Sequence, residues 1–180
     1  PFLTRDYHVV APDLPGFGQN ERNPALPYDI EAQTARLKSF VDALGLRQLH
    51  IAGNSMGGWI ALRYALDFPD ALASLILIDN AGVAGANESD LQKQAANEDY
   101  NPLVLAGIED ADRLVAMVVH KPPFVPSRIK PVLYADALKY RDQLDTAFWV
   151  IATEMRDRPL NDRLGEVTVP TLIIWGRHDR

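Results

Sequence analysis

The chain has 180 residues, of which 47% are hydrophobic and 23% charged, and its formal net charge is -6. This composition is typical of one ordinary globular domain with enough apolar residues for a core. No basic stripe that would neutralise phosphates is present, so we expect no nucleic-acid partner. The sequence contains no cysteine, which excludes disulfides and thiolate metal sites, and we expect neither a metal nor a cofactor.

The sequence also lacks the signals of membrane insertion. No apolar run approaches the roughly 20 residues that span a bilayer, and the first residues lack the basic-then-apolar pattern of a signal peptide. We therefore expect no membrane span. The sequence begins at Pro1 and stops at Arg180 directly after an apolar run, which we interpret as a fragment. Localisation is left open between the cytoplasm and the periplasm or exterior.

The first two predicted elements are a strand and a helix. Residues 7–11 (YHVVA) form a β-prone run, and the prolines and glycines of residues 12–18 (PDLPGFG) end it in a loop. From Asp29, a good helix N-cap, apolar residues recur at helical spacing until Gly45. This pattern predicts an amphipathic helix.

Further apolar runs predict three more strands. Residues 49–52 form a strand that leads through residues 53–58 (GNSMGG) into a predicted helix over 59–68. Residues 75–78 form a continuous apolar run, typical of a parallel strand buried on both faces, and residues 171–175 form another. Strands that alternate with helices predict an α/β fold, with a mostly parallel sheet, flanking helices and a ligand crevice at the carboxyl ends of the strands.

The connection between the last two predicted strands is too long for an ordinary loop and carries its own helical patterns over 111–119 and 133–151. Prolines keep residues 121–126 extended. We interpret this connection as a helical cap inserted before the last strand. The predicted organisation is a core over residues 1–82, a cap over 83–168 and the core resumed over 169–180.

The most informative motif is Gly53-Asn54-Ser55-Met56-Gly57, which matches the G-x-S-x-G nucleophile elbow and lies between a predicted strand and a predicted helix. A serine on so tight a turn is strained, and we expect side chains two residues before and after it to collide, hence the glycines. Ser55 is the predicted nucleophile. The backbone N–H of Met56 opens the helix and is a predicted oxyanion donor. The competing interpretation, an ordinary turn serine, leaves the paired glycines unexplained.

With DLPGFG, GNSMGG and WGRHDR in this order and spacing, the chain resembles the α/β-hydrolase superfamily over nearly its whole length. Members with an aspartate nucleophile are excluded because position 55 is serine. The resemblance places the triad acid at Asp179, after the last strand, and the alternative acid is Asp79, at the end of the preceding strand. Asp13 is interpreted as a turn residue bonded to its own loop.

A serine nucleophile requires a histidine base, and in this family the order is serine, acid, histidine. None of the chain's histidines fits this order or position: His8, His50, His120 and His178. His120 is expected to be solvated or to face the substrate. We expect the catalytic histidine downstream of Arg180 and the second oxyanion amide upstream of Pro1. These 180 residues alone should then have negligible activity.

The elbow predicts attack of Ser55 on a carbonyl, an acyl-enzyme and hydrolysis by water. Residues 121–130 (KPPFVPSRIK) are similar to the cap of bacterial lipases related to monoacylglycerol lipases. The resemblance implies a lipase or esterase, a group that includes the monoacylglycerol type. The implied substrate is a small ester or a lipid, and the resemblance is compatible with contact at a lipid interface. Apolar cap residues that would suit an acyl chain are Leu103, Val104, Leu105, Met117, Val118, Val119, Phe124 and Val125.

Two alternatives stay open. The first is a carbon–carbon bond hydrolase of aromatic ring meta-cleavage products, in which Arg113 or Arg128 would be the positioned arginine. The second is a non-catalytic ligand receptor on the hydrolase fold, because a fold does not fix a function.

Overall fold

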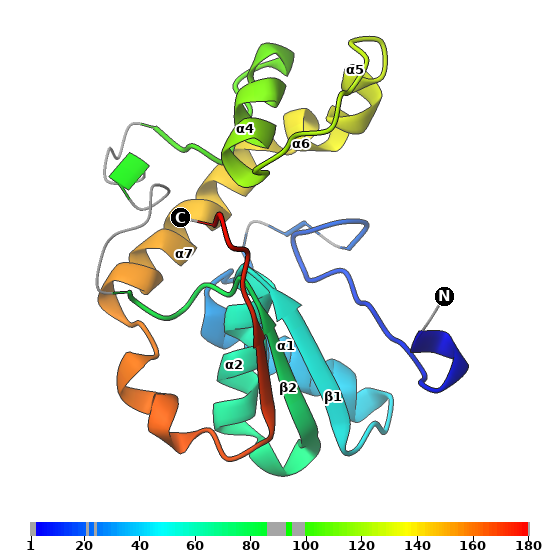
Figure 1. Ribbon diagram of the computed structural model, residues 1–180, viewed down its shortest axis with the longest axis vertical. Coiled ribbons are helices and arrows are strands. Elements are labelled where there is room, and N and C mark those ends of the chain that lie inside the picture. The colour runs from blue at the N-terminus through cyan, green and yellow to red at the C-terminus, as the bar shows by residue number, and fades with distance from the viewer. Residues whose placement is uncertain (1–2, 21, 24, 86–92, 95–99, 180) are drawn as a thin grey trace.

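The computed structural model describes residues 3–20, 22–23, 25–85, 93–94 and 100–179. Its sheet has three parallel strands in the order β1 (Leu49–Asn54), β2 (Leu72–Ile78) and β3 (Thr171–Ile174). Asn54 pairs with Ile78, and Ile78 pairs with Ile174, so the carboxyl ends of the strands meet at one edge (Figure 1). The turns that follow the three strands therefore lie close together.

Two helices cover one face of this sheet. Helix α1 (Ile30–Ala43) begins where the Asp29 side chain accepts a hydrogen bond from the Ala32 amide at 2.8 Å, which confirms the predicted N-cap. Just past its end, Gly45 has a φ of +63°, the left-handed conformation that favours glycine. Helix α2 (Met56–Asp67) packs on β1 and β2, and α1 packs on α2. The core therefore lies between α2 and the sheet.

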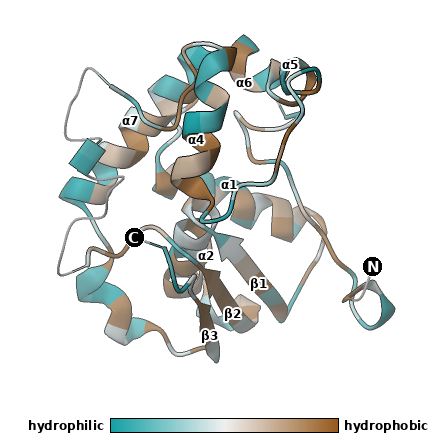
Figure 2. Cartoon of the chain, turned by 45° about the horizontal axis from the view of Figure 1, so that its top comes forward, coloured by the Kyte–Doolittle hydropathy of each residue, from teal (hydrophilic) through white to brown (hydrophobic). Residues whose placement is uncertain are grey.

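The two faces of the sheet are covered unequally. Leu75 and Leu77 of β2 are buried in one cluster with Trp59 of α2, whereas Ile76 and Ile78 on the opposite face are half-buried. All four residues of β3 are exposed. The expectation that these apolar strands are buried on both faces is therefore wrong for the described residues, because α1 and α2 lie on one face. Figure 2 shows β2 as apolar along most of its length.

The predicted strand over residues 7–11 is wrong. The structure assigns no strand there, and the side chains of Tyr7, Val9 and Val10 are exposed. The ring of Tyr7 instead meets the ring of His50 edge-on, with centroids 5.6 Å apart. β-propensity describes a fit to a sheet surface, and without a ladder partner among the described residues it does not make a strand.

The helices that the structure describes between β2 and β3 lie beyond the carboxyl edge of the sheet (Figure 1). They are α4 (Ala111–Val118), α5 (Lys130–Leu133), α6 (Ala135–Lys139) and α7 (Arg141–Asp157). The helix predicted over 133–151 is broken at Tyr134 and Tyr140, whose φ/ψ angles leave the α region. The guanidinium of Arg22 lies over the Tyr140 ring at 3.7 Å, so a tertiary contact accompanies the second break. Residues 86–92 and 95–99 of the predicted cap lie outside the described residues, and the cap boundaries stay a prediction.

Short 3-10 turns complete the described elements. They are η1 (Leu3–Arg5), η2 (Pro69–Ala71), η3 (Ile108–Asp110) and η4 (Asn161–Glu166). None of the helices in the described part of the chain is long and apolar enough to cross a bilayer.

A buried carboxylate joins α7 to the start of α1. Glu154 is almost fully buried, and its Oε2 accepts a hydrogen bond from the Ile30 amide at 2.8 Å. The first amides of a helix have no acceptor within the helix, and the helix dipole favours a negative charge there. Glu154 therefore stabilises the junction of the two helices.

Replacing Glu154 by alanine should lower the free energy of unfolding by about 2 kcal/mol, because a buried amide is left without its acceptor. Glutamine has a side chain of the same length that still carries an oxygen acceptor, so Glu154→Gln should lower the free energy of unfolding by less than half as much. Urea denaturation of both variants measures the difference. Equal losses would show that packing, and not the hydrogen bond, dominates at this position.

Candidate active site

Ser55 occupies a strained position between β1 and α2. Its φ and ψ are +52° and -122°, a conformation that costs a non-glycine residue about 1–3 kcal/mol. Its amide donates to the Ile78 carbonyl at 3.1 Å, and its carbonyl accepts from the amides of Trp59 at 3.1 Å and Ala81 at 3.0 Å. These three hydrogen bonds hold the strained backbone in place. The Ser55 residue is exposed at the carboxyl edge of the sheet.

The glycines around Ser55 divide into two kinds. A Cβ atom at Gly53 would overlap the carbonyl oxygen of Gly57, so the expected need for glycine at position 53 is confirmed. A Cβ atom at Gly57 would meet nothing within 4 Å, so the expected collision there is wrong. The close approach is instead at Gly58, where a Cβ would lie 2.5 Å from the Cβ of Asn80. Both glycines lie in the first turn of α2, but only Gly58 faces the residues that follow β2.

Gly53→Ala should lower the free energy of unfolding by about 3 kcal/mol or more, because the new methyl group has no space and backbone must move. Gly57→Ala is the matched control, since it adds the same methyl group to open space on a helix. It should raise the stability by about 0.5–1 kcal/mol through helix propensity. Chemical denaturation measures both, and the two changes should have opposite signs.

Met56, the predicted oxyanion donor, is the first residue of α2. The first amides of a helix have no acceptor within the helix and point toward its N-terminal end. The Met56 amide is therefore beside Ser55, at the positive end of the α2 dipole. This is the placement that an oxyanion donor requires.

The structure brings both candidate acids to the same edge of the sheet but gives them different partners. Asp79 follows β2 directly, and its Oδ1 accepts a hydrogen bond from the Gly176 amide at 2.5 Å. Its own amide donates to the Ile174 carbonyl at 2.9 Å. Asp179 lies in the exposed turn after β3, where its amide donates to the Gly176 carbonyl at 3.1 Å. Among the described residues no donor is hydrogen-bonded to the Asp179 carboxylate.

The histidines divide between the two ends of the sheet. His50, at the start of β1, shares a hydrogen bond of 2.7 Å between its Nδ1 and the Ser74 hydroxyl. His120 and His178 stack face to face, with ring centroids 3.9 Å apart and planes 12° apart. This stack joins the segment after α4 to the turn that carries Asp179, and nothing in the sequence signals it. In the described part of the chain, no histidine is hydrogen-bonded to the Ser55 side chain.

The DLPGFG loop is held by hydrogen bonds from its own residues and from α1. The Oδ2 of Asp13 accepts from the Gln19 amide at 2.9 Å, which confirms that this aspartate stabilises its own loop. The Gln33 side chain, which is fully buried, donates from Nε2 to the Pro15 carbonyl at 3.1 Å. Gln33 is a supporting residue that sequence reasoning missed, because a glutamine on an amphipathic helix is ordinarily solvated.

The two arginines considered for the alternative chemistry differ in their surroundings. Arg113 donates from Nη1 to the Pro102 carbonyl at 3.0 Å and lies 3.5 Å from Asp110. The backbone N–H of Ala106 holds the pKa of Asp110 below its usual value, so this partner of Arg113 stays ionised. The Arg113 guanidinium is thus held by the Pro102 carbonyl and the Asp110 carboxylate. Arg128 is exposed.

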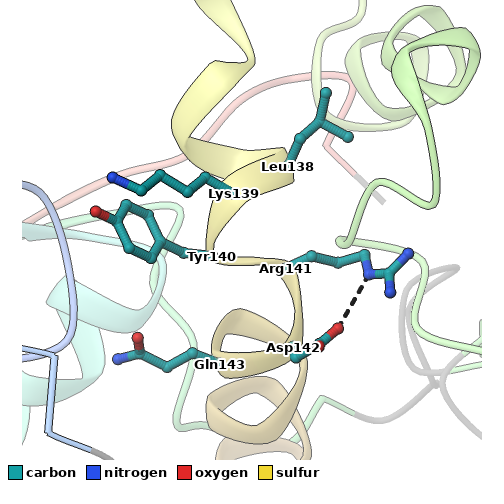
Figure 3. Close-up of a pocket in the computed structure, with 6 residues that line it drawn as sticks. All are labelled: Leu138, Lys139, Tyr140, Arg141, Asp142 and Gln143. Atoms are coloured by element: carbon teal, nitrogen blue, oxygen red, sulfur yellow. Dashed lines mark hydrogen bonds and ion pairs between the residues drawn. The ribbon is translucent and has the colours of Figure 1, made fainter.

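A surface hollow of about 310 Å³ lies at the junction of α6 and α7 (Figure 3). Its lining consists of consecutive residues, 138–143, and includes an ion pair of 3.1 Å between Arg141 and Asp142. None of the candidate catalytic residues lines it. The hollow is therefore a local feature of the helix break at Tyr140.

Comparison with known proteins places the chain in a family. Residues 1–111 match the family model described as the alpha/beta hydrolase fold. The chain belongs to the α/β-hydrolase fold family. The predicted fold class, with its parallel sheet and flanking helices, is thereby confirmed.

Several individual α/β-hydrolases are similar to this one over nearly its whole length. It is 34% identical to Lipase 1 of Psychrobacter immobilis over 97% of the chain and 55% of that protein. It is 30% identical to a 2-hydroxy-6-oxononadienedioate/2-hydroxy-6-oxononatrienedioate hydrolase of Klebsiella pneumoniae, over 100% of the chain and 63% of that protein. The chain therefore spans little more than half the length of the curated relatives that it matches.

Among solved structures, a bacterial membrane phospholipase A superposes with a TM-score of 0.85 at 39% identity, over 93% of the chain and 53% of that protein. A putative lipase from Acinetobacter baumannii superposes with a TM-score of 0.84 at 29% identity, over 99% of the chain and 60% of that protein. Both are similar to this α/β-hydrolase chain in fold and in sequence.

Proposed function

We propose that this α/β-hydrolase cleaves carboxylic esters through an acyl-enzyme on Ser55. The observation that carries the proposal is the backbone of Ser55, which is strained, held by three hydrogen bonds and exposed at the carboxyl edge of the sheet. Strain of this size persists only where the surrounding structure imposes it, and it concentrates at functional sites. The similarity to a lipase supports an ester as the substrate.

In the proposed reaction the Oγ of Ser55 attacks the ester carbonyl carbon while an imidazole takes its proton. The carbonyl oxygen becomes an oxyanion, and the Met56 amide donates a hydrogen bond to it. The imidazole then returns the proton to the departing alcohol. Water, deprotonated by the same imidazole, attacks the acyl-enzyme and releases the acid and Ser55.

The proposal assigns the orienting carboxylate to Asp179, because this carboxylate is exposed and has no hydrogen-bond donor among the described residues. The curated relatives extend well beyond the matched region. We therefore assign the imidazole base, and the second oxyanion amide, to parts of the enzyme outside these 180 residues.

The proposed substrate class is a carboxylic ester with an apolar acyl group, such as a lipid. A second candidate is the hydrolysis of a carbon–carbon bond in a vinylogous diketone, which the Klebsiella pneumoniae relative supports. That chemistry needs a positioned cation for the substrate. Arg128 is the candidate, because it is exposed and makes no hydrogen bond or ion pair with the described residues, whereas Arg113 donates to the Pro102 carbonyl.

The test uses the protein expressed from its complete gene. Wild type is assayed with p-nitrophenyl esters of several chain lengths, a monoacylglycerol and a vinylogous diketone, and a fluorophosphonate probe is used to label the nucleophile. Ester turnover together with covalent labelling at Ser55 supports the proposal. Cleavage of the diketone alone selects the second candidate. A folded protein that turns over nothing and is not labelled would indicate a ligand receptor.

A further inference from the structure

Several large apolar side chains are exposed on residues 118–133, which run from the end of α4 to the end of α5 and are called the cap tip here. Phe124 is 91% exposed and Val132 is 77% exposed. Further large apolar side chains of the cap tip that are exposed are Val118, Val119, Ile129 and Leu133. Soluble surfaces ordinarily scatter such residues singly, whereas a concentration of them marks an interaction site.

The cap tip is also positively charged. It contains Lys121, Arg128 and Lys130 and no acidic residue, in a chain whose formal net charge is -6. The Nζ of Lys130 is held by both carboxylate oxygens of Asp112 at 2.6 Å. Lys121 and Arg128 are exposed, and neither pairs with an acidic side chain that the structure describes. Two uncompensated cations therefore flank the apolar side chains.

The combination of exposed apolar side chains and unpaired cations is complementary to one kind of surface. In an anionic lipid bilayer, an aromatic side chain enters the boundary between headgroups and acyl chains, while lysine and arginine bind the phosphates. The long stems of Lys121 and Arg128 let their charged ends stay at the headgroups while apolar neighbours insert. Pro122 and Pro123 restrict the backbone before Phe124, so little conformational entropy is lost on insertion.

We propose that the cap tip docks onto the anionic surface of a lipid bilayer. Figure 1 shows α5 at the end of the molecule that is distant from the amino ends of the strands, so a flat surface can reach the tip. His120 of the tip stacks on His178, next to Asp179, which connects the docking surface to the candidate site. This connection to catalysis rests on the proposed function, whereas the docking itself does not require Ser55.

The experiment places one environment-sensitive label on the tip. These 180 residues contain no cysteine, so Phe124→Cys offers a single thiol here for a nitrobenzoxadiazole label. Asp70→Cys carries the control label, because Asp70 is exposed in η2, before the amino end of β2. The protein from the complete gene, with any other cysteine replaced, is titrated with phosphatidylcholine vesicles that contain or lack phosphatidylglycerol. A local label reports docking of the tip even if another segment also binds lipid.

Label emission at position 124 should rise and shift to the blue with anionic vesicles, and much less with neutral ones or in high salt. The label at position 70 should not respond. Lys121→Gln and Arg128→Gln should each raise the lipid concentration at half-response by about five-fold, whereas Arg47→Gln, at an exposed site before β1, should not change it.

Three results would overturn the proposal: no response at position 124, an equal response at position 70, or a response that follows protein concentration without lipid, which would indicate a second copy as the partner. Ser55→Ala should dock as wild type does. Docking without ester turnover would contradict the proposed function alone, and ester turnover without docking would contradict this inference alone.

Discussion

Ser55→Ala should lower kcat/KM for an ester by about 10⁶-fold, because the oxygen that forms the acyl-enzyme is removed. The hydrogen bonds that hold the turn come from the backbone of Ser55 and remain in the variant. Alanine also has the same backbone preferences near φ +52°, so the thermal midpoint should change little. Initial rates with a p-nitrophenyl ester and a thermal melt of the same sample measure both effects.

The matched control for this variant is Ser74→Ala. Ser74 lies near the amino end of β2, whereas the candidate site lies at the carboxyl ends of the strands, and the Ser74 hydroxyl is hydrogen-bonded to His50. Its removal should leave kcat/KM unchanged. If Ser55→Ala kept wild-type turnover while folded, the assignment of the nucleophile would be wrong.

Asp179→Asn should lower kcat/KM by about 10⁴-fold, because an amide cannot stabilise the imidazolium or hold the imidazole in the required tautomer. The side chain is exposed and makes no hydrogen bond to the described residues, so stability should be nearly unchanged. Steady-state kinetics and a thermal melt separate a loss of catalysis from a loss of folding.

Asp79→Asn is the comparison that decides between the two acids. The asparagine Oδ1 can still accept the hydrogen bond from the Gly176 amide, so the link between the turns after β2 and β3 should persist. We expect kcat/KM to change far less than in Asp179→Asn. The reverse order of effects would assign the acid to Asp79.

The elements that sequence predicts well are those whose causes are local. The side chain of Asp29 caps the start of α1, and the backbone of Gly45 ends it. The elbow at Ser55 follows from a strand, a tight turn and a helix in succession. The predicted strand over residues 7–11 failed because strand formation depends on a partner elsewhere. The break at Tyr140 was missed because it accompanies a contact with Arg22, distant in sequence.

In the candidate site, too, the features with local causes are predicted from sequence and those that depend on distant residues are not. Ser55 and Met56 are identified by a contiguous motif, whereas Asp79 and Asp179 both follow strands, and sequence alone leaves them as alternatives. The hydrogen bond from the Gly176 amide to Asp79 depends on how β2 and β3 pair, whereas the bond from the Asp179 amide to the Gly176 carbonyl lies within one turn. Gly58, rather than Gly57, proved to be the crowded glycine because the crowding comes from Asn80 on another strand end.

The exposed strand β3 has a consequence for handling the protein. β3 is an outer strand of the described sheet, and its apolar residues Leu172, Ile173 and Ile174 are exposed. An unpaired apolar edge strand is a template for intermolecular β-pairing. A polypeptide of these 180 residues alone should therefore aggregate on refolding, and charged substitutions on β3 would be the first remedy for its solubility.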